Sequence, residues 1–393
     1  MKKGGPLQLL LRSDWLMSVA TLLIVVTGML FVYSAAHVFA DRPVIHFERQ
    51  LLWMGVGLFC YLGLVAVDYR RICREGWWIY AISMALLVLV LCIGLRVRGG
   101  RRWLMLLGVG FQPSEFAKVA TIVLLAQLLS RPKMNLGMAG PVVVVLGVTA
   151  VPALLVMLQP DLGTALVFLP AVVVMMFVAG MPPRMFVTLT LIGLTVAGLM
   201  LSALFLPEKL GCSETTQKVF LRMSGLRSYH KERITGFLAP KKDPLGAGWT
   251  KVQSQIAIGS GGLTGKGFRK GTSNILGFLP RSVAPTDFLF SVVAEESGFF
   301  GAASLLFLFA VLLGCVLRAG AVAVDETGRL LCVGAAVLVF THIFVNIAMT
   351  IGLLPVTGLP LPLMSSGGSF FISVMMLLGM AQSVFVRRYV ARY

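Results

Sequence analysis

This chain is poor in charge and lacks the residue patterns by which metal sites and disulfide frameworks are recognised. Only 13% of its 393 residues are charged, whereas 58% are hydrophobic, and its mean hydropathy is +0.90. Four histidines are scattered along the chain, and the six cysteines show no metal-ligand spacing. The composition therefore excludes a soluble enzyme with one membrane anchor and indicates a chain made mostly of membrane spans.

A glycine-rich stretch at residues 259–267 also lacks the full pattern of a nucleotide-binding loop. A P-loop requires glycine and then serine or threonine where this chain has Ser260 and Gly267. Two interpretations stay open. The backbone amides beside Lys266 and Lys270 could approach a phosphate, or the stretch is an ordinary flexible loop.

The hydrophobic residues form ten runs that are long enough, or nearly long enough, to cross a bilayer. Only helices and closed barrels satisfy their backbone hydrogen bonds in lipid, so we predict an all-α polytopic membrane protein with about ten transmembrane helices. The eighth run is long enough to include a kink. The runs cover residues 15–36, 51–67, 77–95, 116–129, 141–158, 162–178, 185–206, 288–317, 330–354 and 363–386.

The distribution of positive charge predicts the orientation of these spans. Lysine and arginine are more frequent in one set of short loops, which the positive-inside rule places in the cytoplasm with both termini. Residues 207–286 then form one large extracytoplasmic loop between spans seven and eight, within a single transmembrane domain covering residues 1–393. That loop holds thirteen Lys and Arg against four Asp and Glu. It suits anionic lipid headgroups or a phosphorylated substrate, whereas nucleic acid is disfavoured because no nucleic-acid module accompanies the charge.

One carboxylate, Asp287, stands at the predicted membrane edge, between the basic segment and the eighth apolar run. Ionisable groups at such a position are functional candidates by default, because the membrane penalises their charge. The competing interpretation is a helix N-terminus in which Thr286 is the N-cap and Asp287 lies in the first turn.

Further polar clusters are expected on the same side of the membrane. Glu115 and Lys118 are spaced i, i+3 and are expected to pair, with Ser114 as the N-cap of their helix. Asp161 lies in a tight turn and either serves the site or simply caps span six. We interpret the clusters as one outward-facing site, the alternative being arginines that reach lipid headgroups. The candidate substrate-binding residues are Arg101, Arg102, Gln112, Ser114, Glu115, Lys118, Asp161, Lys266, Lys270 and Ser366.

Several of these segments carry a resemblance to a known family. In order, they resemble motifs of the SEDS family (shape, elongation, division and sporulation), and residues 262–280 are more similar to its elongation branch than to its division branch. Pro285 and Ser366 depart from the histidine and tyrosine that the family commonly has there. The segments are Arg101–Leu104, Phe111–Lys118, Gln159–Ala165, Ile256–Leu263, Thr286–Phe288 and Gly358–Pro362.

The resemblance implies a peptidoglycan glycosyltransferase, an inverting hexosyltransferase that polymerises lipid II at the outer face of the bacterial cytoplasmic membrane during cell elongation. It places Asp287 at the position of the family's essential carboxylate. It also implies a class B penicillin-binding protein as transpeptidase partner, other membrane proteins of the elongation complex, and undecaprenyl pyrophosphate as the leaving product.

The chemistry of that reaction agrees with a single carboxylate. A sugar that leaves with a lipid pyrophosphate already has a good leaving group, so one base acting on the acceptor hydroxyl suffices. Cations stabilise the departing charge, and the candidates are Arg101, Arg102, Lys118, Lys266 and Lys270. No cofactor is assigned, although a divalent cation (Mg or Mn) stays open. Glu295 and Glu296 are interpreted as structural or gating groups.

Three other functions compete with this one. A lipid II flippase would use buried acids and proline-broken spans for alternating access. A non-enzymatic scaffold would only recruit the transpeptidase, and a division paralogue would act at another stage of the cell cycle. Ionisable residues at the outer edge of the spans favour chemistry at the surface over transport.

Overall fold

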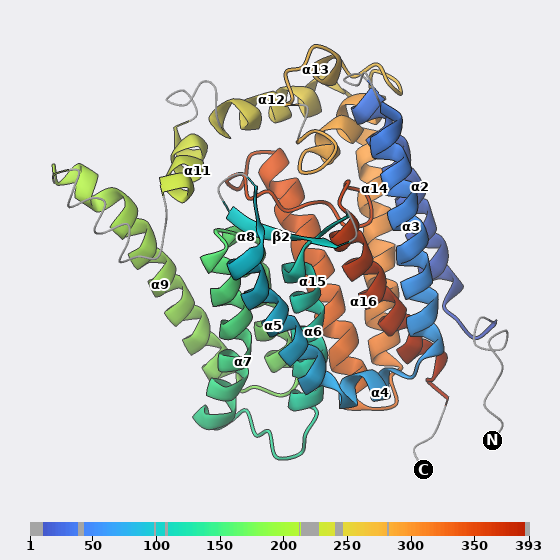
Figure 1. Cartoon of the computed structure of the whole chain (residues 1–393), viewed down its shortest axis with the longest axis vertical. Coiled ribbons are helices and arrows are strands. Elements are labelled where there is room, and N and C mark those ends of the chain that lie inside the picture. Colours follow the sequence, from blue (N-terminus) through green and yellow to red (C-terminus); the bar gives the residue numbers. More distant parts are fainter. Residues whose placement is uncertain are drawn as a thin grey trace.

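The computed structural model describes residues 11–37, 43–97, 100–106, 109–211, 213, 228–239, 247–280 and 283–389. These residues form a helical bundle (Figure 1). The predicted all-α architecture is confirmed, and each of the ten apolar runs corresponds to a helix. The helices are α2 (Trp15–His37), α3 (Pro43–Ala66), α5 (Gly76–Ile93), α6 (Pro113–Leu129), α7 (Ala139–Leu158), α8 (Leu162–Val178), α9 (Pro183–Lys209), α14 (Leu289–Ala321), α15 (Glu326–Thr350) and α16 (Gly368–Val386).

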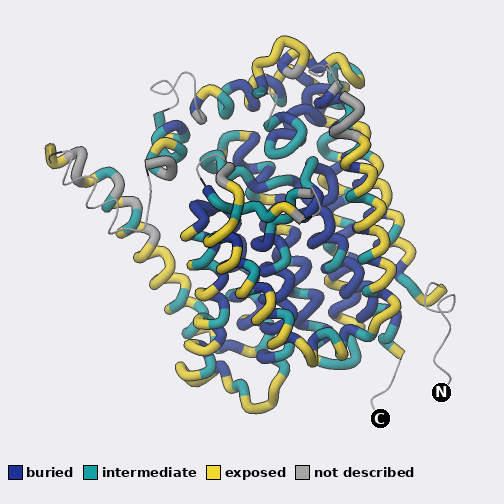
Figure 2. Tube along the Cα trace, viewed as in Figure 1, coloured by how far each residue is buried: buried dark blue, intermediate teal, exposed yellow. Residues whose placement is uncertain are grey.

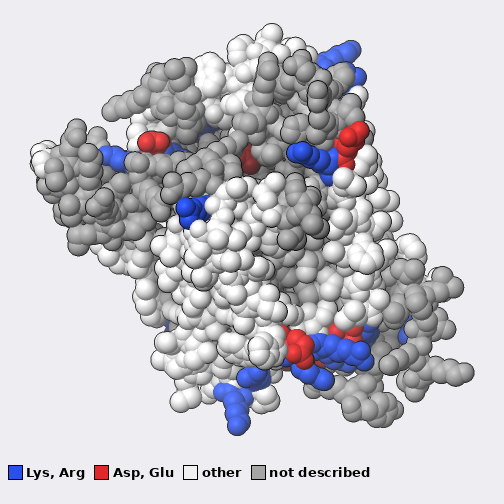
Figure 3. Space-filling model, viewed as in Figure 1, with Lys and Arg blue, Asp and Glu red and all other residues white. Residues whose placement is uncertain are grey.

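Eight of the described helices are long and apolar enough to cross a membrane. The other two, α6 and α8, have 17 residues each, which corresponds to roughly 26 Å at the α-helical rise per residue. On the face that Figure 3 shows, the described charged side chains lie toward the two ends of the bundle, and the described surface between them is uncharged. This distribution is typical of a protein whose middle lies in lipid.

Most residues of α6, α15 and α16 are buried, and the buried part of the trace runs through the middle of the bundle (Figure 2). In α16, 94% of the membrane-length window is buried, whereas no residue is buried in the corresponding window of α9. A helix that is apolar on all sides is stable at the centre of a bundle or against lipid. Gly379 shows how closely the helices approach, because a Cβ there would lie 2.8 Å from the backbone oxygen of Tyr61 in α3.

A small antiparallel sheet, absent from the prediction, connects α5 to α6. Its strands β1 (Leu95–Val97), β2 (Gly100–Leu106) and β3 (Val109–Phe111) pair in sequence order. Consecutive residues of a strand point to opposite faces. Arg101 and Arg102 are neighbours on β2, so the sheet separates two side chains that the sequence analysis assigned to one site.

The predicted loop at residues 207–286 contains helices of its own. These are α11 (Ser228–Leu238), α12 (Ala247–Ser260) and α13 (Thr272–Ile275), and α12 and α13 lie across one end of the bundle (Figure 1). Residues 212, 214–227, 240–246 and 281–282 lie outside the described part of the chain. We call this end of the bundle, with α12 and α13, the α12 end.

The helix α14 is interrupted near that end, as the length of the eighth run suggested. Gly298 has φ 66° and ψ −164°, outside the helical region. The turn that follows α12 packs into the interruption, since a Cβ on Gly298 would lie 2.3 Å from the amide nitrogen of Gly265. Glycine is required on both sides of so close a backbone contact.

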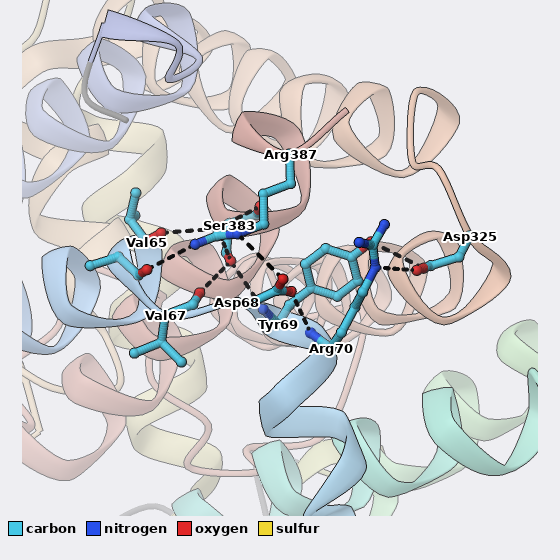
Figure 4. A network of polar contacts seen from close by, with 9 residues as sticks. Val65, Val67, Asp68, Tyr69, Arg70, Asp325, Ser383 and Arg387 are labelled. Carbon is cyan, nitrogen blue, oxygen red and sulfur yellow. Dashed lines mark hydrogen bonds and ion pairs between the residues drawn. The ribbon is translucent and has the colours of Figure 1, made fainter. Parts of the chain in front are cut away.

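The opposite end, which includes α4 (Tyr69–Arg74), is held by a network of ion pairs and hydrogen bonds (Figure 4). Arg70 Nε lies 2.7 Å from Asp325 Oδ2, and the hydroxyl of Tyr69 donates to Asp325 Oδ1 at 3.1 Å. Arg387 Nη1 donates to Ser383 Oγ at 2.6 Å. We call this the α4 end, and it joins the connections after α3 and α14 to the C-terminal part of α16.

Candidate functional site at the α12 end

Asp287 lies in a turn just before α14, and its backbone is held from two other parts of the chain. Asn346 on α15 donates from Nδ2 to the backbone oxygens of Asp287 at 2.8 Å and Leu359 at 2.7 Å. The hydroxyl of Ser365 donates to the backbone oxygen of Thr286. The amide of Ser366 donates to the oxygen of Pro285 at 3.0 Å. The turn is therefore fixed independently of the carboxylate.

The structure excludes the capping interpretation of this segment. The N-cap of α14 is Phe288, no side chain caps it, and its first turn contains no acidic residue. The hydroxyl of Thr286 donates instead to the carbonyl of Val283, at 3.3 Å. Asp287 thus precedes the helix, and neither it nor Thr286 is the N-cap.

An arginine that the sequence analysis did not select lies beside this carboxylate. Gly358 has φ +79°, and a Cβ there would lie 3.5 Å from Asp287 Oδ2 and 3.6 Å from Arg233 Nη2. Arg233 belongs to α11, and its Nη1 donates to the backbone oxygen of Thr357 at 2.6 Å. The carboxylate and the guanidinium therefore both lie close to this glycine, where a larger residue would have less room.

A cavity of about 190 Å³ adjoins Arg233, and Asp287 is not among the residues that line it. Arg102 Nη1 lies 3.4 Å from Asp161 Oδ2 at its wall, and Arg102 also donates to the backbone oxygens of Gln159 and Pro160. Asp161 Oδ1 accepts from the amide of Thr164, so the expected cap of α8 is confirmed. The cavity is lined by Arg102, Pro160, Asp161, Leu162, Gly163, Leu166, Arg233, Ile234, Pro355, Val356 and Thr357.

Arg101 points elsewhere, as the alternation of β2 requires. Its Nη1 donates to the backbone oxygens of Leu91 at 3.1 Å and Cys92 at 2.7 Å, in the last turn of α5. A cation bonded to the last carbonyls of a helix stabilises its C-terminus. In this structure Arg101 caps α5 and does not line the cavity.

The predicted pair of Glu115 and Lys118 forms, with Lys118 Nζ 2.8 Å from Glu115 Oε2. Lys118 Nζ also lies 2.9 Å from His342 Nε2 on α15, and the hydroxyl of Ser373 donates to Glu115 at 3.4 Å. Only 1% of Lys118 and 3% of Glu115 are exposed, and neither lines the cavity. These ionisable groups therefore lie inside the bundle. The expectation that they lie at the outer edge of the spans, which was used against a transport function, is wrong for this pair.

His342 and Asn346, one turn apart on α15, join this buried pair to the Asp287 turn. His342 contacts Lys118 of α6, whereas Asn346 binds the backbone of Asp287. Both side chains therefore form hydrogen bonds between separate segments of the chain. The α15 helix thus contacts both the buried pair of α6 and the backbone of the candidate site.

Gln112 and Ser114 stabilise the start of α6. The N-cap of α6 is Gln112, with Pro113 as the first helical residue, so the expected cap at Ser114 is wrong. Proline is favoured at this first position because its missing amide proton has no partner there anyway. The amide of Gln112 donates to Ser369 Oγ at 3.0 Å, and its side chain donates to Ser114 Oγ at 3.1 Å.

Lys266 binds to a carboxylate and not to the cavity. Its Nζ lies 2.6 Å from Oε1 of Glu295, which is fully buried and also accepts from the amide and hydroxyl of Ser273. Lys270 is exposed. Neither lysine lines the cavity between Arg102 and Arg233.

The glycine-rich turn is structural. Its amides at Lys266 and Gly267 donate to the backbone oxygens of Glu295 and Glu296, at 3.0 and 2.9 Å. The amide of Gly265 donates to Gly261. These donors are satisfied by the chain itself, so this conformation does not offer them to a phosphate.

The fold and this site define a polytopic helical membrane protein in which Asp287, Asp161, Arg102 and Arg233 are grouped at the α12 end. The model of the cell cycle protein family that comprises FtsW, RodA and SpoVE matches residues 14–389. The chain belongs to this family, which confirms the SEDS resemblance.

Similar proteins cover nearly the whole chain. Stage V sporulation protein E of Bacillus subtilis is 36% identical over 94% of this chain and 96% of its own length. Peptidoglycan glycosyltransferase MrdB of Escherichia coli K12 is 37% identical over 94% of this chain and 93% of its own length.

Two solved structures share the fold. A chain from a structure described as the structural coordination of polymerization and crosslinking by a peptidoglycan synthase complex matches with a TM-score of 0.76 at 30% identity, covering 96% of this chain and 99% of its own. The rod shape determining protein RodA of Thermus thermophilus matches with a TM-score of 0.67 at 29% identity, covering 96% of this chain and 98% of its own.

Proposed function

We propose that this chain is a peptidoglycan glycosyltransferase that polymerises lipid II, with Asp287 as general base. The observation that carries the proposal is that Asp287 and Arg233 both lie close to Gly358, and that Arg233 and Arg102 line one cavity. The relative MrdB, which is similar to this chain over nearly its whole length, is named a peptidoglycan glycosyltransferase. A fixed carboxylate beside two cations suits a reaction that removes one proton and releases an anion.

In this proposal Asp287 takes the proton from the acceptor sugar hydroxyl as that oxygen attacks the anomeric carbon of the donor. The bond to the lipid pyrophosphate breaks, and undecaprenyl pyrophosphate departs with the electron pair. General-base catalysis of this kind contributes roughly 10²- to 10⁴-fold. The carboxylate is well placed because Asn346 fixes its backbone from α15.

Arg233 and Arg102 are the cations we assign to the pyrophosphate. Guanidinium groups bind phosphate oxygens through two parallel hydrogen bonds, and this geometry favours arginine over lysine. Asp161 holds Arg102 at the cavity wall. Arg233 comes from α11, outside the main bundle, so the position of this segment decides whether the pyrophosphate site is complete.

The other predicted substrate residues are assigned supporting roles. Glu115 and Lys118 act beneath the site through α15, and Gln112, Ser114 and Ser366 stabilise the segments around it. We still predict that Lys266 and Lys270 bind substrate in a substrate-bound arrangement of the α12 end. For Arg101 the remaining prediction is contact with lipid headgroups. Within the described residues no three His, Cys, Asp or Glu side chains cluster as metal ligands. A divalent cation would therefore take most of its ligands from the pyrophosphate.

We further propose that the α4 end, where the predicted cytoplasmic arginines gather, faces the cytoplasm. The site at the α12 end then faces outward. The partner we propose is a class B penicillin-binding protein. One structural relative comes from a complex that coordinates polymerization and crosslinking, and this finding supports that partner. The elongation branch remains our assignment within the family.

One observation favours a second candidate, a lipid II transporter. The buried cluster of Glu115, Lys118 and His342 lies inside the bundle, and buried ionisable groups often mark a transport path. A scaffold function makes no use of either set of charges.

Polymerisation by the purified chain with its transpeptidase partner separates the three functions. Wild type and Asp287→Asn are given lipid II, and glycan chains are resolved on a gel. We expect chains from wild type only. Chains from Asp287→Asn at the wild-type level would contradict the role of Asp287, whereas no chains from wild type would favour transport or scaffolding.

A further inference from the structure

A second cavity, of about 340 Å³, lies at the α4 end, far from the proposed site along the bundle. It is formed by the ends of α14 and α16 and by the turn that follows α16. Its walls are Arg318, Val322, Phe385, Arg388 and Tyr389. Two arginines in a group of five, with no carboxylate among them, make this a cationic hollow at a helix end.

Both guanidinium groups are held against aromatic rings. The guanidinium carbons of Arg318 and Arg388 lie 5.5 and 3.9 Å from the ring centre of Phe385. The guanidinium of Arg388 also lies 4.5 Å from the ring centre of Tyr389. An arginine stacked on a ring keeps its plane fixed and its edge donors open.

Hydrogen bonds within the chain fix the two arginines further but use only part of their donors. Arg318 Nη2 pairs with the buried carboxylate of Asp14. Arg388 Nη1 donates to the backbone oxygens of Phe385 at 2.8 Å and Arg12 at 3.1 Å. Among the described residues, the Nε and Nη2 of Arg388 and the Nε and Nη1 of Arg318 have no acceptor.

The surroundings place the cavity at a membrane surface. Tyr389 is 73% exposed, and Trp15, at the start of α2 beside Asp14, is 59% exposed. Exposed aromatic residues at the ends of spans mark the level of lipid headgroups. Below the arginines, α14 presents the exposed apolar side chain of Leu317. A ligand here would meet cations at its head and an apolar helix surface beneath.

We propose that this cavity binds the phosphate of an anionic phospholipid, with Arg318 and Arg388 donating to its oxygens and the acyl chains lying along α14. Guanidinium groups bind phosphate oxygens through paired hydrogen bonds, and basic pockets between helices are typical of sites for lipids whose headgroup has a net negative charge. The bound lipid joins α14, which begins just after Asp287, to the C-terminal end of α16.

Lipid binding to the purified full-length chain tests the proposal. The delipidated protein is titrated with dioleoyl phosphatidylglycerol, and binding is followed by native mass spectrometry and by the thermal midpoint. The variant Arg388→Gln, whose side chain forms no ion pair among the described residues, is compared with Arg131→Gln. Arg131 is an exposed arginine at the same end, next to Ser130, which bonds to Thr327.

We expect Arg388→Gln to weaken phosphatidylglycerol binding about tenfold, the effect of losing one charge-assisted contact. Arg131→Gln should bind as wild type does. A second variant, Arg318→Lys, keeps the charge beside Asp14 but loses the planar donors, and it should also weaken binding. Equal loss in Arg131→Gln would show a diffuse surface charge effect and would overturn the site.

Two further ligands identify what the cavity recognises. Phosphatidylcholine should give no comparable shift of the thermal midpoint, because its headgroup carries no net charge. An equal shift would overturn selectivity for anionic lipid. Inorganic phosphate should bind more weakly than phosphatidylglycerol. Equally tight binding of inorganic phosphate would show that the cavity recognises a soluble anion and would overturn the lipid proposal.

Discussion

Asn346 is the residue through which the fold most directly controls the proposed base. It is fully buried on α15, and its side-chain amide holds the carbonyls of Asp287 and Leu359 at 2.8 and 2.7 Å. In Asn346→Ala both carbonyls lose this donor. A buried acceptor left without its donor costs about 1–3 kcal/mol.

The net effect is smaller than twice that cost. Asn346 Oδ1 is itself a buried oxygen without a partner, and its removal offsets part of the loss. We therefore expect Asn346→Ala to destabilise the arrangement of the Asp287 turn by about 1–3 kcal/mol. This range corresponds to roughly 5- to 150-fold in an equilibrium or rate. The loss acts on the position of Asp287, so kcat should fall about tenfold and KM for lipid II should change little.

The assay is the steady-state rate of lipid II polymerisation by the purified chain with its partner, together with thermal unfolding. The matched control is Asn135→Ala, since Asn135 is exposed and its side chain accepts only from the amide of Gly137 among the described residues. The control should keep wild-type rate and stability. Folded Asn346→Ala protein with wild-type kcat would refute the view that α15 positions the base.

Three further predictions test other parts of the structure. Arg233→Gln should raise KM for lipid II and lower the polymerisation rate about tenfold, because a charge-assisted contact is lost. Arg233→Lys should recover part of the activity. Unchanged kinetics would show that Arg233 does not belong to the site. Glu295→Gln should lower the free energy of unfolding by about 3–5 kcal/mol, because it leaves Lys266 without its buried partner. The double variant Glu295→Gln with Lys266→Met should recover part of that loss. An unchanged melting curve for Glu295→Gln would contradict a stabilising ion pair. Burial raises the pKa of Cys73 to about 12, so at pH 8 a maleimide should label Cys73 only after unfolding. The exposed Cys92 should react in the folded chain. Labelling of both cysteines at the same rate would contradict the burial of Cys73.

The fold was predictable where a property depends on neighbouring residues. The ten apolar runs became ten helices because lipid and the bundle interior both require hydrophobic surface and internal hydrogen bonding. The pair of Glu115 and Lys118 follows from helical spacing alone. The cap at Asp161 likewise depends only on the next three residues.

The parts that were missed depend on tertiary structure. Arg233 was one of thirteen cations in a basic segment, and only the packing of α11 against the segment containing Thr357 selects it. Arg101 was assigned to the site because no pattern in the neighbouring sequence predicted a strand. In strand β2 its side chain points to the face opposite that of Arg102. The N-cap predicted at Ser114 falls two residues earlier because Pro113 starts the helix.

The glycine-rich turn shows the same limit. Its composition allowed either a phosphate site or a loop, and the structure shows a third role, a backbone contact with the interruption of α14 at Gly298. A contact between residues more than thirty positions apart leaves no local pattern. Sequence alone therefore recognises the flexible backbone but not its partner.

The rate of polymerisation by Asp287→Asn shows whether Asp287 is the general base. The measurement uses saturating lipid II and the purified chain with its partner, after unfolding curves show that the variant is folded. The account predicts a loss of at least about 100-fold, the lower end of what a general base contributes. A rate within tenfold of wild type would contradict it.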